Sequence, residues 1–572
     1  MQRHQWLLTC ALPGLALGCG SEPRDEFPAV GTGAGSSSVS TSEGASGASG
    51  ASGASGEGDT DSPGSTGNSD GQDTSAEPGG SAPGDESGDV RFDLGTPTSG
   101  GGTAEGGEHS SCQVGSDGEA SSCENEAPPN SFEPEVQWSW DRLGSTNTPL
   151  VVNLTDDDGN GVIDLCDTPD VVVVDGVGAD LVVLDGATGA LHFETAGVHS
   201  GLTPAVGDID GDGLPEIITG TGGTFDFGVT AFEHDGTLKW KSAQPWDYLQ
   251  ASASAIALAD LDNDGDVEII AGNHLFDHLG NRLWIASVPL NNVNASTAAD
   301  LDGDGDLEMI IGQAAYHHDG STYYHNPDVV AVGFGLFPQV ANLDTDPEPE
   351  VLVAAGAGMY VLEHTGATKV KVSPAGMGST GGLYPATIHD FDGDLVSEFA
   401  VSSGTLYTVH EPDGVIRWSA PVTDASGVAA GTAFDFLGDG VAEAMYADEY
   451  MMFAFDGQTG QVVMQIPRSS GTAIEYPTVA DVDNDGSAEM IVVSNANAGP
   501  KTAPSVQVIR DKQDRWIAAR RIWNQHTYHV TNVREDGTIP QFEPPHWKSL
   551  NTFRTNAQIE QGGVCKPDPP AE

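Results

Sequence analysis

The stretch DIDGDGLPE (208–216) decides the fold, because related stretches return along the chain. Its aspartates alternate with other residues, a glycine permits a sharp turn, and a glutamate closes the stretch at the ninth position. The related stretches are NLTDDDGNGVID (153–164), DLDNDGDVE (260–268), DLDGDGDLE (300–308), NLDTDPEPE (342–350), DFDGDLVSE (390–398), DFLGDGVAE (435–443) and DVDNDGSAE (481–489). The chain therefore contains eight repeats, each with an acidic loop between apolar segments.

The spacing of the repeats predicts the architecture. From Asp208 onward, the first positions of successive loops lie 52, 40, 42, 48, 45 and 46 residues apart. This is the length of one four-stranded propeller blade. We therefore predict an all-β protein, a β-propeller of seven to eight four-stranded blades, with eight favoured. The stretch EVQWSW (135–140) looks like a fourth strand without its blade, and we expect it to complete the last blade and close the ring.

The alternating aspartates predict cation sites. Asp-x-Asp-x-Asp-Gly places carboxylates around one point, and oxygen ligands in flexible geometry suit calcium better than magnesium. Four loops contain a full set of ligands: Asp208, Asp210, Asp212 and Glu216; Asp260, Asp262, Asp264 and Glu268; Asp300, Asp302, Asp304 and Glu308; Asp481, Asp483, Asp485 and Glu489.

The other four loops depart from this pattern. The first is EF-hand-like, with Gly161 at position 6. Its expected ligands at positions 1, 3, 5, 9 and 12 are Asp156, Asp158, Asn160, Asp164 and Asp167. In the remaining three, Pro347, Leu395 and Leu437 replace a turn glycine or a ligand, and their occupancy stays open. We expect about four to six Ca²⁺ ions in total.

The repeats resemble FG-GAP and VCBS-type repeats, the units of integrin α-subunit-like propellers and of many bacterial surface proteins. The DxDxDG…E loop after an apolar strand is the most specific part of the resemblance, which covers roughly residues 135–510. It implies a propeller that holds calcium in its blade loops, and it does not imply integrin function. The tail RRIWNQHTYHVTNVREDGTIP (520–540) resembles a segment that closes some bacterial members of this class.

Outside the repeats, the sequence predicts export. Residues 1–18 resemble a lipoprotein signal peptide, and Ala16-Leu17-Gly18-Cys19 resembles a lipobox, which implies lipidation of Cys19. By the same resemblance, Gly20 favours the outer membrane or cell surface. Residues 19–131 are rich in Gly, Ser, Ala and acidic residues, and we expect a disordered tether. The propeller is expected at 132–515 and a closing segment at 516–572.

Four cysteines remain beyond the signal segment and Cys19. In an exported chain they predict disulfides, and Cys112 with Cys123 is the pairing expected from proximity, which leaves Cys166 with Cys565. Four cysteines allow three pairings.

Charge and motifs narrow the function. The net charge of −64 repels phosphate backbones, so nucleic acid is not an expected partner. We expect a non-catalytic binding, adhesion or scaffolding module with a protein or glycan ligand at the cell surface. The alternative is a polysaccharide lyase or another hydrolase built on a calcium-rich propeller. Its candidate residues are His317, His318, Arg520, Arg521, His526, Tyr528 and His529.

Overall fold

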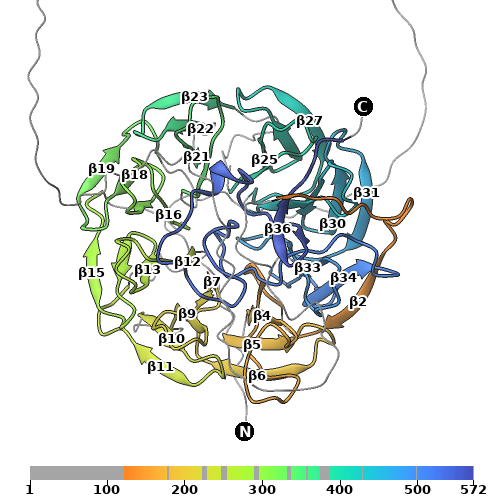
Figure 1. Cartoon of the computed structure of the whole chain (residues 1–572), viewed down its shortest axis with the longest axis horizontal. Helices are drawn as coiled ribbons and strands as arrows, with labels where there is room; N and C mark the ends of the chain where they lie inside the picture. Colours follow the sequence, from red (N-terminus) through yellow and green to blue (C-terminus); the bar gives the residue numbers. More distant parts are fainter. Residues whose placement is uncertain are drawn as a thin grey trace, which may run out of the picture. The chain divides into compact units, whose positions relative to one another are not determined.

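The computed structural model describes residues 121–570 except 143, 177–178, 222–227, 247–253, 289–294, 331–335, 356–357, 374–384, 428 and 498. The expected signal peptide, Cys19, Cys112 and most of the expected tether lie outside the described residues. The described residues belong to a compact unit that spans residues 84–572. Within them, eight sheets surround a centre (Figure 1). The predicted eight-bladed propeller is confirmed.

Each blade is an antiparallel sheet whose first strand lies at the centre of the ring and whose last strand lies at the rim (Figure 1). Blades 1 to 4 consist of β3 (Leu150–Val152), β4 (Asp170–Asp175), β5 (Asp180–Asp185) and β6 (Leu191–Ala196); β8 (Ala205–Gly207), β9 (Glu216–Gly220), β10 (Val229–Phe232) and β11 (Leu238–Lys241); β12 (Ser254–Ala259), β13 (Glu268–Ala271), β14 (His274–Phe276) and β15 (Arg282–Ile285); β16 (Thr297–Ala299), β17 (Glu308–Ile310), β18 (Ala314–Tyr316) and β19 (Thr322–His325). The short β7 (Leu202–Thr203) adds to blade 3 by parallel pairing with β12.

The second half of the ring repeats this order. Blades 5 to 7 consist of β20 (Pro338–Ala341), β21 (Glu350–Ala355), β22 (Gly358–Glu363) and β23 (Thr368–Val372); β24 (Thr387–His389), β25 (Glu398–Ser403), β26 (Leu406–His410) and β27 (Ile416–Pro421); β28 (Gly431–Phe434), β29 (Glu443–Ala447), β30 (Met451–Asp456) and β31 (Val462–Pro467). Blade 8 consists of β32 (Thr478–Ala480), β33 (Glu489–Val493), β34 (Val506–Asp511) and β2 (Pro134–Trp140).

Blade 8 closes the ring with a strand from the other end of the domain. Strand β2 pairs antiparallel with β34, with Trp138 opposite Val508. The expectation that 135–140 completes the last blade is therefore confirmed. Because this pairing covers the free edge of β34 and joins the first and last repeats, the ring needs no separate cap at that edge.

The core lies between neighbouring blades. The middle strands are buried on both faces, as in the stretch Val171–Val174 of β4. At the rim, large side chains of one blade contact the hairpin turn of the next. A Cβ atom at Gly280, whose φ is +79°, would lie 2.5 Å from the Trp240 ring, so this turn requires glycine for both its conformation and its packing.

A β-bulge occurs at the same place in the outermost strand of every blade. One residue of that strand is skipped in the pairing with its neighbour. We call it the bulge residue, and in order from blade 1 to blade 8 it is His192, Lys239, Leu283, Tyr323, Lys369, Arg417, Val463 and Gln137. Bulges re-aim side chains, and here they matter for the acidic loops.

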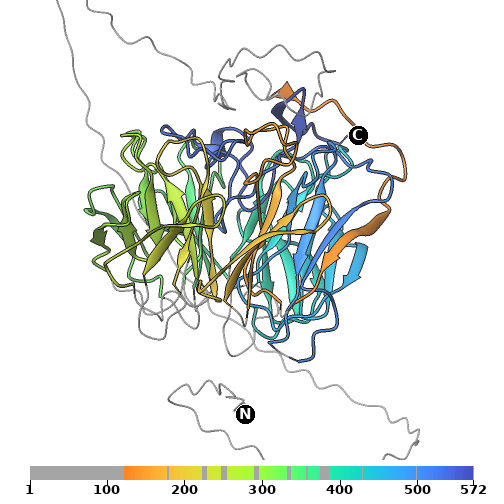
Figure 2. The same ribbon diagram turned by 90° about the horizontal axis from the view of Figure 1, so that it is seen from below.

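The C-terminal segment (residues 516–570) crosses the centre of the ring on one face (Figures 1 and 2). It pairs with the first strand of one blade after another: Trp523 bridges Val151 of blade 1, and Phe553 bridges Ile388 of blade 6. Several of its large side chains, including Trp523 and Tyr528, are fully buried. Its regular elements are the 3-10 helix η2 (His546–Lys548), β35 (Ile559–Glu560) and β36 (Gly563–Lys566). No α-helix occurs in the described ranges.

The disulfides correct the predicted pairing. Cys123 is bonded to Cys565, 442 residues away. The strand β1 (Ser121–Ser122) runs parallel to β36 beside this bond. Cys166 is also disulfide-bonded. Proximity in sequence failed as a guide because the C-terminal segment returns to the start of the domain.

Candidate metal centres

The acidic loops connect the first and second strands of the blades and lie on the face crossed by the C-terminal segment. The segment contacts several of them directly: the Gln541 amide donates to the carbonyl of Asn263, and the Asn551 amide donates to the carbonyl of Asn342. We number the loops by blade: loop 1 (153–167), loop 2 (208–216), loop 3 (260–268), loop 4 (300–308), loop 5 (342–350), loop 6 (390–398), loop 7 (435–443) and loop 8 (481–489).

The loops share one turn geometry. In loop 2, the first aspartate accepts hydrogen bonds from the backbone N–H groups of Gly211 (2.7 Å) and Gly213 (3.0 Å) through its two carboxylate oxygens. The closing Glu216 uses Oε2 to accept the N–H of Ile209 at 3.0 Å. The closing glutamates of loops 3, 4 and 8 accept the corresponding N–H in the same way. One carboxylate oxygen is thereby fixed, and the other remains for a further partner.

In loops 3 and 8, buried carboxylate oxygens have no hydrogen-bond partner among the described residues. Asp260 Oδ1, Asp481 Oδ1 and Glu489 Oε1 are buried and accept no hydrogen bond. Burial raises the pKa of Asp481 to about 8 and that of Glu268 to about 8, and it raises the pKa of Glu489 well above its ordinary value, with the neighbouring aspartates adding to each shift. Buried carboxylates without partners are costly, and a bound cation would compensate them.

The bulge residue decides whether a loop already contains a cation. In blade 2 the Lys239 ammonium lies 2.7 Å from Asp210 and 2.9 Å from Glu216, two of the expected calcium ligands. Burial alone would lower the pKa of Lys239, but its hydrogen bonds to carboxylates raise it. Lys369 contacts Glu350 of loop 5 at 2.8 Å in the same way. Loops 2 and 5 therefore hold an ammonium group among their ligands.

Blades 1 and 6 present other basic bulge residues. His192 contacts Asp170, the first residue of β4, at 3.0 Å, and Arg417 contacts Asp392 of loop 6. The bulge residues of the four remaining blades are neutral: Leu283, Tyr323, Val463 and Gln137. Three of these blades, numbers 3, 4 and 8, also contain a full set of predicted ligands. In blade 4, His317 Nδ1 lies 2.9 Å from Glu308.

The first loop brings part of its predicted ligand set together. Asp156, Asp158 and Asp167 offer oxygen atoms within 4.8 Å of one another. The Asn160 amide donates to Asp158 at 3.0 Å, so it borders this group. Asp164 Oδ1 accepts a hydrogen bond from the backbone N–H of Cys166, so this oxygen of Asp164 is already occupied.

Loop 6 contains a cluster that sequence reasoning did not select. Asp390, Asp392, Asp394 and Glu398 offer oxygen atoms within 4.8 Å of one another. Leu395 replaces the turn glycine, yet it adopts a φ of 70° and its N–H donates to Asp390 Oδ2 at 2.8 Å, as the glycine does elsewhere. Burial raises the pKa of Glu398 to about 9, and its Oε1 has no hydrogen-bond partner among the described residues. The carboxylate pattern alone was the signal that would have found it.

Most candidate residues for catalysis are buried in the C-terminal segment. The Arg520 guanidinium donates to Glu535 Oε2 at 2.9 Å and to Tyr528 Oη at 3.0 Å, and the Tyr528 hydroxyl donates to Asn556 Oδ1 at 2.8 Å. His526 is fully buried. Arg521 donates to the carbonyl of Leu165 at 2.9 Å. Outside the segment, His318 pairs with Asp306 at 2.9 Å. Of the buried groups, Arg520 and Tyr528 support the fold of the segment through these contacts.

A cavity lies between the acidic loops and the C-terminal segment. Its volume is about 430 Å³, and it is lined by parts of loops 5, 6 and 7 and by stretches of the segment. Asp344, Asp390 and Lys548 contribute charge to its wall, and Trp547 and Leu550 contribute apolar surface. A recess with a few polar groups on an apolar wall has the character of a ligand site.

Blade 2 has a lysine at the bulge and blade 3 has a leucine, so exchanging the two residue types should have opposite effects on calcium binding. Lys239→Met leaves the fully buried Glu216 beside Asp210 without its cation. We expect this variant to lose about 3 kcal/mol of stability in chelator, because one partner of a buried pair is removed. Calcium should restore the loss, and equilibrium dialysis should show one additional bound ion.

Leu283→Lys is the matched variant in blade 3. The side chain of Leu283 is 51% exposed at the bulge, so a lysine fits there and is expected to displace one calcium ion. Unchanged calcium counts in both variants would contradict the assignment of the bulge residue as the built-in cation.

The raised carboxyl pKa values predict a pH dependence in chelator. A carboxyl whose pKa is raised on folding binds a proton more tightly in the folded state, so stability falls as pH rises through the folded pKa. For Glu268, Glu398 and Asp481 this loss extends from the ordinary carboxyl range at about pH 4 up to their folded pKa values of about 8 to 9, so it continues above pH 7. Below pH 6.5 buried histidines such as His526, whose pKa burial lowers, oppose the trend.

We therefore expect the calcium-free protein to melt at a higher temperature at pH 7 than at pH 9. Each such group lowers the free energy of unfolding by up to about 1.4 kcal/mol per pH unit below its folded pKa. Saturating calcium should reduce the difference. Thermal unfolding in chelator at both pH values measures it, and a higher melting temperature at pH 9 would contradict it.

Comparison with known proteins agrees with the fold. A family model described as an FG-GAP-like repeat matches residues 208–271, which span blade 2 and the start of blade 3. The chain therefore contains an FG-GAP-like repeat, as the resemblance predicted. No curated protein sequence matches the chain.

Solved structures with similar folds are numerous. The V. cholerae biofilm matrix protein Bap1 is 22% identical, with a TM-score of 0.63, over 76% of this chain and 100% of that chain. Rhamnogalacturonan lyase PL11 of Bacillus licheniformis is 16% identical, with a TM-score of 0.45, over 74% of this chain and 80% of that chain. At these identities the similarity to Bap1 supports the propeller fold alone. In the described part of the chain, no helix has the length and apolarity to cross a membrane.

Proposed function

We propose that the protein is a calcium-stabilised propeller that acts as a non-catalytic binding module at the cell surface. The observation that carries the calcium proposal is the set of buried carboxylate oxygens without partners in loops 3 and 8, at Asp260, Asp481 and Glu489. These oxygens fit the ligand preference of calcium. When bound, the ion would supply the positive charge that Lys239 supplies in loop 2.

The structure ranks the loops for this proposal. Loops 3, 4 and 8 combine full ligand sets with neutral bulge residues, so they are the strongest candidates. Loop 1, through Asp156, Asp158 and Asp167, would add one more. Loop 6 would add another, because Glu398 Oε1 has no partner among the described residues even though Arg417 contacts Asp392. Five sites lie within the expected range of about four to six. Loop 2 has a full ligand set, but Lys239 competes there.

The binding role rests on the cavity on the loop face. Its wall combines backbone, carboxylate and lysine groups with the apolar surface of Trp547. Such a recess suits a glycan or a peptide loop, both of which present polar groups around a small apolar face. Bap1, which shares the fold, is described as a biofilm matrix protein. Lipidation of Cys19 would hold the propeller at the cell surface.

A paired assay separates binding from catalysis. The purified exported chain is incubated with whole cells and with a panel of acidic and neutral polysaccharides, in calcium and in chelator. We expect saturable, calcium-dependent retention without change in the polysaccharide, and loss of retention in a variant with Trp547→Ala. Release of unsaturated uronate products, detected by ultraviolet absorption, would instead establish the lyase alternative and overturn the non-catalytic proposal.

A further inference from the structure

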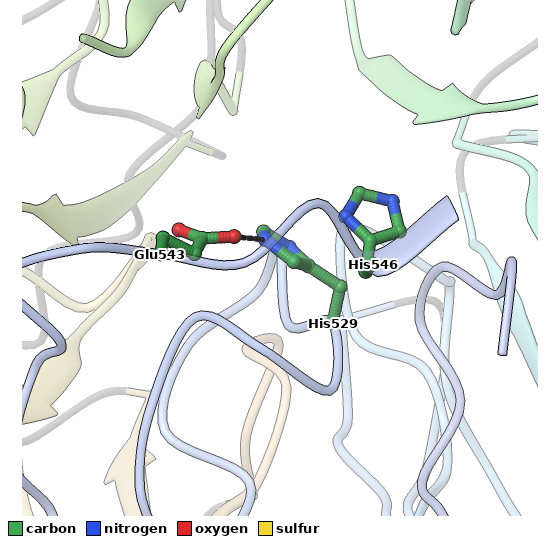
Figure 3. Close-up of side chains that lie close together, drawn as sticks. All are labelled: His529, Glu543 and His546. Atoms are coloured by element: carbon green, nitrogen blue, oxygen red, sulfur yellow. Dashed lines mark hydrogen bonds and ion pairs between the residues drawn. The ribbon is translucent and has the colours of Figure 1, made fainter. Parts of the chain in front are cut away.

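Three side chains of the C-terminal segment, none of them from an acidic loop, lie close together. His529, Glu543 and His546 each offer a ligand atom within 4.8 Å of the others (Figure 3). Both histidines are almost fully buried, at 2% and 1% exposure. The two imidazole rings lie with their centroids 4.4 Å apart. The cluster joins two stretches of the segment that are 14 to 17 residues apart in sequence.

Hydrogen bonds fix which ring nitrogen of His546 carries the proton. Its Nε2 lies 2.8 Å from the carbonyl oxygen of Val340 in blade 5, and a carbonyl only accepts, so Nε2 carries the hydrogen. Nδ1 then presents a lone pair. That nitrogen is buried and has no hydrogen-bond partner among the described residues. A buried lone pair without a partner calls for an electrophile or a donor.

His529 is held in the complementary way. Its Nδ1 lies 3.0 Å from the carbonyl oxygen of Thr527, and its Nε2 lies 2.6 Å from Glu543 Oε1. Both ring nitrogens therefore face acceptors. Without a metal ion, one proton must lie between His529 Nε2 and Glu543 Oε1, and the bare Nδ1 of His546 still lacks a donor.

A metal ion satisfies all these groups at once. His529 would keep its Nδ1–H on the Thr527 carbonyl and offer Nε2, while His546 would keep its Nε2–H on Val340 and offer Nδ1. A backbone carbonyl that accepts the remote N–H of a ligating histidine is the usual outer-shell support of a metal site. Glu543 Oε1 completes the set and is itself positioned by the hydroxyl of Thr531, which donates at 3.0 Å.

We propose that His529, Glu543 and His546 bind one divalent transition-metal ion of the zinc class. Two imidazoles and one carboxylate suit zinc and its neighbours, whereas calcium prefers oxygen ligands alone. The ion would tie residues 527–532 to residues 543–547 and, through Val340, to blade 5. This site shares no residue with the calcium loops, whose predicted ligands are carboxylate and amide oxygens.

The test uses the full chain, loaded with zinc alone or with cobalt alone after removal of bound metal. We expect one zinc ion per chain by elemental analysis, retained in millimolar calcium and removed by a zinc-selective chelator. Cobalt should give visible absorption typical of nitrogen coordination. Zinc should also raise the melting temperature.

Glu543→Gln is the informative variant, because glutamine keeps the shape and can still contact His529. We expect at least a tenfold loss of zinc affinity with a native melting transition in calcium. Asp536→Asn is the matched control: it makes the same change of charge at an exposed position of the same segment and should bind zinc like the parent chain. Zinc content near zero in the parent, or equal affinity in Glu543→Gln, would overturn the proposal and leave the His529–Glu543 ion pair as the role of the cluster.

Discussion

Millimolar calcium is expected to raise the melting temperature of the protein on the order of 10 °C relative to chelator. Extracellular calcium modules bind at roughly 0.1–1 mM, so saturation of each site contributes about 1–2 kcal/mol through preferential binding to the folded state. Five sites together would add about 5–10 kcal/mol, which rivals the whole stability of an ordinary domain. The buried oxygens of Asp481 and Glu489 are the groups whose cost would be relieved.

The controls separate specific binding from charge screening. Magnesium at the same concentration and sodium chloride at matched ionic strength should give much smaller shifts, because magnesium requires stricter geometry and screening acts on all 85 acidic side chains alike. Glu489→Gln should lower the calcium-induced shift by one site. Equal shifts in calcium, magnesium and sodium would contradict the proposed sites.

Ending the chain after Asp514 is expected to abolish cooperative folding of the propeller. The truncation removes the buried Trp516, Trp523 and Tyr528, and each large buried side chain contributes about 1.5–3 kcal/mol. It also removes the backbone pairing with the inner strands and the Cys123–Cys565 bond. The summed loss exceeds the stability of a typical domain, so we expect rapid proteolysis and no sharp melting transition.

Two point variants measure how much single side chains of the C-terminal segment contribute to stability. Trp523→Ala should cost about 3–5 kcal/mol, because a fully buried indole leaves a large void. Phe542→Ala lies in the same segment, but its side chain is 68% exposed, and it should leave the melting temperature nearly unchanged. A truncated chain that melts like the parent would show that the C-terminal segment is an accessory to the ring.

The blades could be predicted from sequence because their signal is local and repeated. Each acidic loop stands between two strands of one hairpin, so the spacing of Asp208, Asp260 and Asp300 reports the blade length directly. The ring closure was predictable for the same reason, since EVQWSW (135–140) matches the outer strands at Trp240 and Trp284.

The cation chemistry of the loops was only partly predictable. Lys239 lies 23 residues beyond Glu216, on the far strand of the same blade, and a bulge turns its side chain to the loop. Binary strand patterns do not reveal a bulge, so loop 2 looked equivalent to loops 3, 4 and 8. Leu395 misled in the opposite direction, because the loop holds it in a conformation that glycine usually supplies.

The path of the C-terminal segment could not be predicted from local sequence patterns. Its contacts reach blades 1, 5 and 6 in turn, through Trp523, His546 and Phe553. No periodic pattern marks a chain that follows the centre of a ring. The disulfide partner of Cys123 depended on that path, which explains why proximity gave the wrong pairing.

The place of the Cys123–Cys565 bond has a mechanical consequence. Cys123 precedes β2, so tension applied through the residues before it reaches a covalent link before it reaches the strand that closes the ring. Load that reaches Cys123 passes into β36 and the C-terminal segment, whose contacts are spread around the ring, and β2 is not peeled from β34 one hydrogen bond at a time. A propeller pulled at Cys123 thus bears force in shear across its hub, and reduction of the Cys123–Cys565 bond would transfer that load to the pairing of β2 with β34 in blade 8.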